Sequence, residues 1–390
     1  MTIPQREVSV AGARLLLDGA LVEAEVTVAD GRIARIGGAA PNGATVLDAH
    51  GWLLLPGLID IHGDAFERQL QPRPGVDFPA DIALIDTDRQ LLANGITTAF
   101  HGVTLSWEPG LRGVETFRAL LDARARLDGA LAADNRIHLR LETYAMDAWP
   151  DAEAAIASGR IDLLAFNDHT AEIARRSEDP ARAAKYAERA HVKGPEILRL
   201  AREMLAREGE VATFVERAAA AAREAGLPMA SHDDASPAVR ARWRALGCGI
   251  CEFPMNAETG LAARAAGEGV IMGCPNVVRG GSHMGWHSAE AMVRAGACDI
   301  LASDYYYPAM LRAAFALAAR GALALPDAWA LVSANPARAA KLDDRGRIAE
   351  GLRADLVLVD AEQGRPPRVM ATIAAGRLAY LTPEAAARLG

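Results

Sequence analysis

The chain has 390 residues, of which 51% are hydrophobic and 24% are charged, and its formal net charge is −8. These values are ordinary for a soluble enzyme with a large core, and the absence of a basic run gives no sign of nucleic-acid binding. No apolar run approaches the roughly 20 residues that cross a bilayer, and the N-terminus lacks the pattern of a secretion signal. We therefore expect a cytoplasmic enzyme with a small-molecule substrate and no nucleic-acid or membrane partner, and a homo-oligomer remains open.

Both ends of the chain predict short β-strands separated by turn residues. Alternating apolar residues and Gly-containing turns such as Asp30-Gly31 are typical of a small antiparallel sheet. The predicted terminal strands span 13–17, 24–28, 32–36, 345–348, 354–359 and 369–374. Neither end has enough strands to bury a core alone, so we expect residues 1–56 and 346–390 to form one composite β-sandwich domain.

Residues 57–345 predict an α/β domain, because apolar strand-like runs alternate with helical stretches. The eight predicted strands span 58–62, 97–103, 137–144, 161–167, 228–231, 249–253, 269–273 and 299–303. Eight such strands favour a (β/α)₈ TIM barrel, which takes about 250 residues. The segment 170–224 is longer than one crossover helix, and we expect it to cover the site at the C-terminal ends of the strands.

The first predicted barrel strand ends in His62-Gly63-Asp64. Residues two apart on a strand lie on the same face, so His62 and Asp64 can both point into the barrel mouth. An imidazole and a carboxylate in this position suit zinc or manganese.

Four further candidate ligands lie at or just beyond the ends of other predicted strands. They are Glu142, His169, His232 and Asp304. A single histidine or carboxylate is more often a structural residue than a ligand, but six that converge from different strands predict a site for one or two divalent ions.

The order His, Asp, Glu, His, His, Asp resembles the ligand set of the amidohydrolase superfamily, a family of metal-dependent hydrolases. This resemblance implies a zinc-type centre bridged by a carboxylate, with Asp304 as the residue that handles protons. The family's usual second histidine is replaced by Asp64, and its usual bridging carboxylated lysine by Glu142.

Several longer runs are similar to one branch of that superfamily, the diphosphatases that act on α-D-ribose 1-methylphosphonate 5-triphosphate in phosphonate metabolism. The runs are 71–76 (QPRPGV), 231–235 (SHDDA), 275–283 (PNVVRGGSH) and 303–306 (SDYY). The resemblance implies hydrolysis of a phosphoanhydride with release of pyrophosphate. Arg73, Arg279 and His283 are the candidate substrate-binding residues, because guanidinium, glycine N–H and imidazole groups suit phosphate oxygens. The stretches 65–67 and 101–107 depart from the branch.

Two alternatives remain open. The same metal-activated water could attack the C–N bond of an amide or cyclic amide, and a barrel can also serve as a non-catalytic scaffold. A neutral amide would not need Arg73 and Arg279 together, and a scaffold would not need a complete ligand set. The basic residues of the segment 170–224, Arg176 among them, are interpreted as a solvated helical face.

Overall fold

The computed structural model describes residues 7–281 and 288–390, and its largest sheet has eight strands in chain order. All neighbouring pairs are parallel. The strands are β8 (Leu58–Gly63), β9 (Ile96–Leu105), β10 (Asp134–Glu142), β11 (Leu163–Asn167), β12 (Met229–His232), β13 (Ile250–Glu252), β14 (Gly269–Gly273) and β15 (Ile300–Ala302). Each overlaps one predicted range, and the predicted α/β barrel is confirmed.

The sheet closes on itself where β8 meets β15. At the C-terminal end, the Asp304 N–H donates to His62 O (3.0 Å), and the Asp64 N–H donates to Asp304 O (2.9 Å). At the opposite end, the carbonyls of Leu331 and Val332 accept hydrogen bonds from β15 and β8. The closure therefore holds three predicted site residues against one another.

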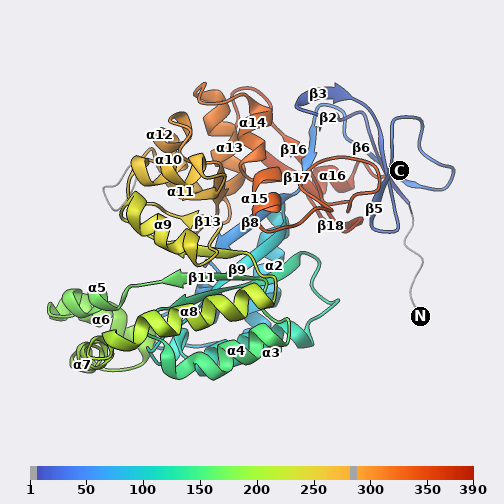
Figure 1. Ribbon diagram of the computed structural model, residues 1–390. Helices are drawn as coiled ribbons and strands as arrows, with labels where there is room; N and C mark the ends of the chain where they lie inside the picture. The colour runs from blue at the N-terminus through green and yellow to red at the C-terminus, as the bar shows by residue number, and fades with distance from the viewer. Residues whose placement is uncertain (1–6, 282–287) are drawn as a thin grey trace.

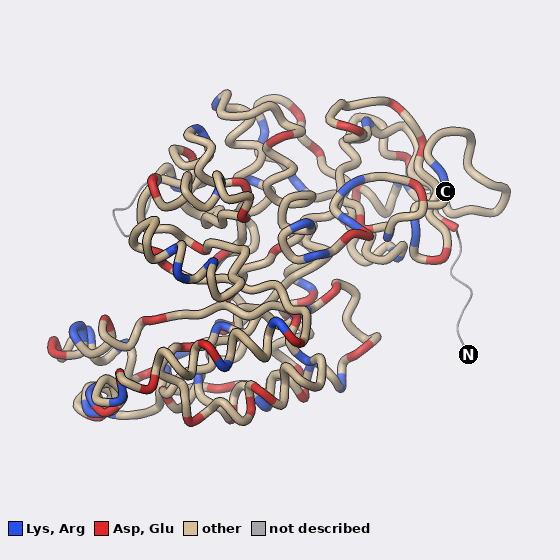
Figure 2. Tube along the Cα trace, viewed as in Figure 1, with Lys and Arg blue, Asp and Glu red and all other residues tan. Residues whose placement is uncertain are grey.

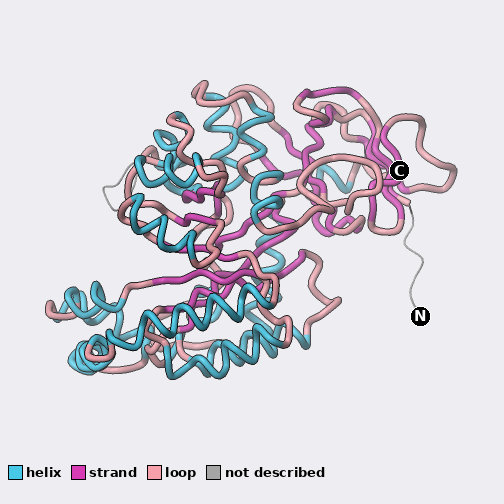
Figure 3. The backbone as a smooth tube through the Cα atoms, viewed as in Figure 1, coloured by secondary structure: helices cyan, strands magenta, loops and turns pink. Residues whose placement is uncertain are grey.

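Helices surround the barrel and bury its outer face, and the strands are accordingly buried along nearly their whole length on both faces. Figure 3 shows these helices outside the strands. They include α2 (Ala80–Ala93), α3 (Val114–Arg126), α4 (Trp149–Ala157), α8 (Glu208–Glu224), α9 (Pro237–Ala245), α10 (Ala257–Ala265), α11 (Cys274–Arg279), α12 (Ala289–Arg294), α13 (Ala309–Ala319), α14 (Leu325–Ala330) and α15 (Ala334–Ala339). Among the described helices, none combines the length and the apolar character that a membrane span requires.

The two ends of the chain build a pair of smaller sheets at the right of Figure 1. One sheet contains β1 (Val8–Ala11), β4 (Val26–Ala29), β5 (Arg32–Ile36) and β6 (Thr45–Asp48), and the other contains β2 (Arg14–Leu17), β3 (Ala20–Glu23), β7 (Leu53–Pro56), β16 (Leu356–Asp360), β17 (Arg368–Ala374) and β18 (Arg377–Leu381). The antiparallel pairing of β7 with β16 joins the two ends. The short helix α16 (Pro383–Ala386) follows them.

The predicted strand at 345–348 was wrong, because this segment is a loop. Arg345 is buried there, and its Nη1 donates to Asp134 (2.6 Å) at the start of β10. A buried guanidinium requires such side-chain acceptors. The position of this segment is therefore set by the ion pairs of Arg345, and the segment joins no sheet.

The segment 170–224 forms α8 and a helical insertion, which we define as α5 (Thr170–Arg176), α6 (Pro180–Ala190) and α7 (Gly194–Leu205). The insertion has its own small apolar core, which includes Ile173 and Ile197. It lies at the end of the molecule opposite the terminal sheets (Figure 1). Figure 2 shows charges of both signs along its helices.

Candidate active site

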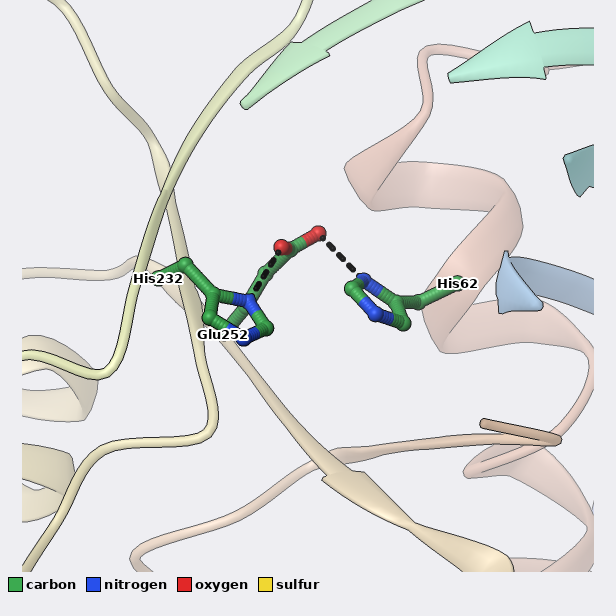
Figure 4. A group of neighbouring side chains, drawn as sticks. All are labelled: His62, His232 and Glu252. Atoms are coloured by element: carbon green, nitrogen blue, oxygen red, sulfur yellow. Dashed lines mark hydrogen bonds and ion pairs between the residues drawn. The ribbon is translucent and has the colours of Figure 1, made fainter. Parts of the chain in front are cut away.

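A carboxylate and two imidazoles from three strands face one another in the barrel (Figure 4). Glu252 Oε1 lies 3.1 Å from His62 Nδ1, and Glu252 Oε2 lies 3.2 Å from His232 Nδ1. A third imidazole joins from β10, with His138 Nε2 3.5 Å from Glu252 Oε1. We call these four residues the central cluster.

Strand register explains why the central cluster forms. His232 ends β12 and Glu252 ends β13, and the two residues are direct partners in the parallel pairing. Glu252 is not among the predicted ligands, although it is the last residue but one of the predicted strand 249–253. The criterion that selected Glu142, an acidic residue at a strand end, applies equally to Glu252.

The central cluster fits a divalent cation. Both ring nitrogens of the buried His138 have no hydrogen-bond partner within the residues that the structure describes, and His62 Nδ1 and Glu252 Oε1 contact each other only as an ion pair, without hydrogen-bond geometry. Buried polar atoms are normally paired, and imidazole nitrogens with carboxylate oxygens are common zinc ligands. Ligand atoms of His62, His232 and Glu252 all lie within 4.8 Å of one another.

The protonation states of His138 and Glu252 support the same interpretation. Burial lowers the pKa of His138 to about 3, so its imidazole is neutral. Burial opposes the charge of Glu252, but His62 and His138 hold its pKa well below the usual range. Neutral imidazoles and ionised carboxylates are the forms that bind metal ions.

A second group of possible ligands shares His232. His169 Nε2 lies 3.7 Å from Asp233 Oδ2, and His232 Nε2 lies 3.6 Å from Asp233 Oδ1. Asp233 follows β12 with a left-handed φ of 58°, which turns the chain at the strand end. Asp233 is not among the predicted ligands, since no spacing rule separates it from its neighbour Asp234.

Glu142 lies against His169 and belongs to neither group of possible ligands among the described residues. Its Oε1 lies 2.6 Å from His169 Nδ1, and its Oε2 accepts the His169 N–H at 3.0 Å. Burial opposes both charges, but each partner stabilises the other, so the pKa of Glu142 falls to about 2 and that of His169 rises to about 9. A carboxylate in this position orients a histidine ligand.

Asp304 and Asp64 lie together at the junction of β8 and β15. Burial, followed by the charge of Asp64, raises the pKa of Asp304 to about 7. Asp304 has a φ of 57°. The preceding turn is fixed by Asp60, which accepts hydrogen bonds from Ser303 Oγ (2.5 Å) and from the Ser303 N–H (2.9 Å).

These residues line a cavity of about 310 Å³. All six predicted ligands contribute to its wall: His62, Asp64, Glu142, His169, His232 and Asp304. Five arginines also line it: Arg112, Arg140, Arg176, Arg189 and Arg279. The cavity therefore combines possible metal ligands with a concentration of guanidinium groups.

The three predicted substrate-binding residues differ in position. Arg279 ends α11 on the cavity wall, where its Nη1 donates to Tyr305 Oη at 3.4 Å. Arg73 is exposed in a turn and is not part of the cavity wall. His283 lies outside the described residues.

Three of the cavity arginines were not predicted, and a fourth was interpreted differently. Arg112, Arg140 and Arg189 carry no local sequence signal, because they come from three elements far apart in the chain: a 3₁₀ helix, strand β10 and helix α6. Arg176 was interpreted as part of a solvated face, but it lines the cavity beside Glu172, at an N···O distance of 2.5 Å.

Solved structures share this architecture. An amidohydrolase from an environmental sample of the Sargasso Sea has a TM-score of 0.65 and 17% identity, covering 96% of this chain and 93% of that one. Dihydropyrimidinase from Brevibacillus agri NCHU1002 has a TM-score of 0.60 and 14% identity, covering 96% and 95%. At these identities the likeness concerns the fold alone.

Sequence comparisons are more specific. The chain is 35% identical over 357 residues to the α-D-ribose 1-methylphosphonate 5-triphosphate diphosphatase of Escherichia coli (strain K12), covering 88% of this chain and 93% of the relative. The model of the amidohydrolase family matches residues 89–380. The chain therefore belongs to the amidohydrolase family.

Proposed function

We propose that this protein is a metal-dependent diphosphatase that hydrolyses a phosphoanhydride of α-D-ribose 1-methylphosphonate 5-triphosphate and releases pyrophosphate. The observation that carries the proposal is that five arginines line the same cavity as the metal-type residues. Guanidinium groups match phosphate oxygens in charge and geometry. The identity to the Escherichia coli diphosphatase supports the same substrate, and we propose that the enzyme acts in the cytoplasm.

The central cluster would hold a divalent ion, for which zinc suits the nitrogen and oxygen donors. Such an ion supplies Lewis-acid chemistry, since it acidifies water and polarises a phosphoryl oxygen. His169 and Asp233 offer a second set of donors that shares His232, and Asp64 and Asp304 remain candidate ligands. We assign Glu142 to orienting His169.

The chain's own residues can perform the remaining steps. Water adds to phosphorus, the bond to the bridging oxygen breaks, and pyrophosphate leaves from a ribose 5-phosphate product. Asp304, with a pKa of about 7 caused by burial and by Asp64, can accept the proton of the attacking water near neutral pH. Arg140 and Arg279 can stabilise the charge on the phosphoryl oxygens.

Hydrolysis of an amide or cyclic amide is the alternative, because the same water could attack a carbonyl carbon. A neutral amide gives no reason for five arginines in one cavity. The test compares release of phosphate or pyrophosphate from a ribose 5-triphosphate with hydrolysis of a panel of amides. We expect activity on the triphosphate only, and turnover of amides alone would contradict the proposal.

Variants sharpen this test. Arg279→Ala removes one charge-assisted contact, and it should slow triphosphate hydrolysis by roughly ten- to a hundredfold. Arg242→Ala is the matched control, because Arg242 is exposed on α9 and is not part of the cavity wall. Equal activity of the two variants would remove Arg279 from the substrate site.

A further inference from the structure

Two of the cavity arginines are held in the same way by glutamates, the partly buried Glu67 and the buried Glu108. Arg112 donates from Nε and Nη2 to the two carboxylate oxygens of Glu67, at 3.2 and 3.1 Å. Arg189 donates from Nε and Nη2 to the two carboxylate oxygens of Glu108, at 2.9 and 2.7 Å. Each glutamate therefore fixes the plane and direction of one guanidinium.

This arrangement leaves donors available on both arginines. Each glutamate occupies the same edge of its guanidinium, and the described residues provide no further hydrogen-bond acceptor for either group. The side chains of Arg112 and Arg189 are 17% and 21% exposed, and both line the cavity. Their remaining N–H groups are therefore available to an anion in the cavity.

The two pairs come from different parts of the chain but form one unit. Arg112 ends the short 3₁₀ helix η1 (Gly110–Arg112), and Arg189 lies in α6 of the insertion. Gly110 has a φ of 72°, and a Cβ there would lie 2.5 Å from the carbonyl oxygen of Arg189. Only glycine allows η1 and α6 to pack this closely.

Further contacts fix the insertion to the barrel loops. Trp107 Nε1 donates to Thr170 Oγ1 at 2.9 Å, and Gln71 Nε2 lies 2.8 Å from His191 Nε2. Arg189 also lies over the ring of Tyr186, with its Cζ 4.9 Å from the ring centroid. The insertion therefore holds Arg189 in a defined position beside η1.

The two pairs also interact electrostatically. Burial opposes the charge of Glu67, but Arg112, and more weakly Arg140 and Arg189, lower its pKa. Burial likewise opposes the charge of Arg112, while Glu67 and then Glu108 raise its pKa. The four groups are thus close enough to act as one charged unit.

We propose that Arg112 and Arg189 form a specificity clamp that binds the distal phosphates of a polyphosphate chain, the part of the substrate that leaves as pyrophosphate. This inference rests on the proposed function and adds the residues that select a triphosphate over a monophosphate. Two fixed guanidiniums match a group with several anionic oxygens. One half of the clamp belongs to the insertion, so the insertion gives the barrel its preference for a chain of phosphates.

Binding can be measured separately from turnover of the sugar triphosphate. Inorganic tripolyphosphate and orthophosphate are titrated calorimetrically into the metal-loaded protein, with the divalent ion included in the blank. The test variant is the double exchange Glu108→Gln with Arg189→Gln, because it leaves no unpaired buried carboxylate. Tripolyphosphate should bind about ten- to a hundredfold more weakly to this variant, and orthophosphate should bind as to the parent protein.

The matched control is Glu196→Gln with Arg199→Gln, which removes an ion pair of the same kind from the exposed face of α7. It should bind both anions as the parent protein does. If the test variant does not fold, Arg189→Lys replaces it, since lysine keeps the charge but cannot donate to a carboxylate and a phosphate in one plane.

The outcomes separate the clamp from the proposed function. Unchanged tripolyphosphate binding in a folded test variant overturns the clamp, even if the protein hydrolyses triphosphates. Equal loss of orthophosphate and tripolyphosphate binding also overturns it, because the arginines would then not select the distal phosphates. A selective loss supports the clamp, and if the parent protein hydrolyses no phosphoanhydride, the proposed function alone fails.

Discussion

The guanidinium of Arg140 lies 3.4 Å from the carboxylate of Asp64, and this is its only hydrogen bond to the described residues. Arg140 is buried, and its Nε has no partner there. Gly102 on β9 leaves room for the side chain, since a Cβ at that position would lie 3.1 Å from Arg140 Cδ. A buried cation with unused donors therefore lies beside the central cluster, where a phosphoryl oxygen can satisfy it.

We expect Arg140→Gln to reduce kcat for triphosphate hydrolysis by about ten- to a hundredfold, because charge on the phosphoryl oxygens develops in the transition state. KM should change much less. The control is Arg126→Gln, an exposed residue at the end of α3. A change in KM alone would assign Arg140 to ground-state binding.

The geometry of the central cluster leads us to propose Glu252 as a metal ligand, which the sequence did not predict. Glu252→Gln removes the charge that faces His62 and His232, and metal affinity should fall by roughly ten- to a hundredfold or more. Metal content after dialysis and the shift of melting temperature on adding a chelator both measure this effect. The parent protein should respond to the chelator and the variant should not, whereas Glu258→Gln on the exposed face of α10 should behave as the parent does. Full metal content in Glu252→Gln would exclude Glu252 as a ligand.

Asp304→Asn should fold and lose turnover. Asparagine tolerates the left-handed backbone at φ 57°, but it cannot accept a proton from water, so kcat should fall by about 10²- to 10⁴-fold at saturating metal. Asp18→Asn is the control, because Asp18 has a similar φ of 47° on the exposed surface of the terminal sheets. Normal turnover by metal-saturated Asp304→Asn would remove Asp304 from the chemistry.

Much of the fold follows from the sequence, because most barrel strands are largely apolar runs, and four of them end at a polar residue: Glu142, Asn167, His232 and Glu252. The same regularity locates His62, His169 and His232 on the cavity wall. It does not distinguish Glu252 from an ordinary strand-end residue, and it cannot reveal that Glu142 faces His169. The roles of Glu252 and Glu142 depend on which side chains of the neighbouring strands and loops each carboxylate contacts in the folded protein.

The arginines that line the cavity were harder to predict than the strand-end residues, for a physical reason. Arg112 and Arg189 are 77 positions apart in the sequence, and they come together only because η1 packs against α6. Glu67 lies in one of the two stretches that the sequence analysis expects to depart from the diphosphatase branch, and Glu108 directly follows the other. The expected departures therefore lie beside the residues of the proposed clamp.

The ion pairs of Asp134 predict a pH dependence of stability. The carboxylate of Asp134 accepts hydrogen bonds from Arg345 Nη1 at 2.6 Å and from Arg136 Nε at 3.0 Å. Burial opposes its charge, but Arg136 and Arg345 together lower its pKa. A folded-state pKa below the unfolded value adds stability at higher pH, and this stability is lost as the pH falls through the folded-state pKa.

Asp134→Asn should therefore lower the free energy of unfolding at pH 6 by on the order of 1–3 kcal/mol. The difference from the parent protein should shrink below about pH 4, where the unfolded parent also takes up the proton. Denaturant unfolding at several pH values measures it, with the exposed Asp128→Asn as control. A difference that stays constant down to acid pH would contradict the assignment.

The last prediction concerns the joint core of the two chain ends. Leu356 on β16 and Leu54 on β7 are fully buried in the same cluster, at 0% exposure, and their strands pair antiparallel. A chain that ends at Arg345 lacks β16, so the terminal sheets should unfold and residues 7–56 should become sensitive to protease. Leu356→Ala should lower stability by about 2–5 kcal/mol by opening a cavity, whereas Val22→Ala, at 37% exposure on β3 of the same sheet, should change it by about 0.5 kcal/mol or less. A truncated chain with the parent melting temperature would show that the N-terminal strands fold without β16, and the two ends would then be separate units.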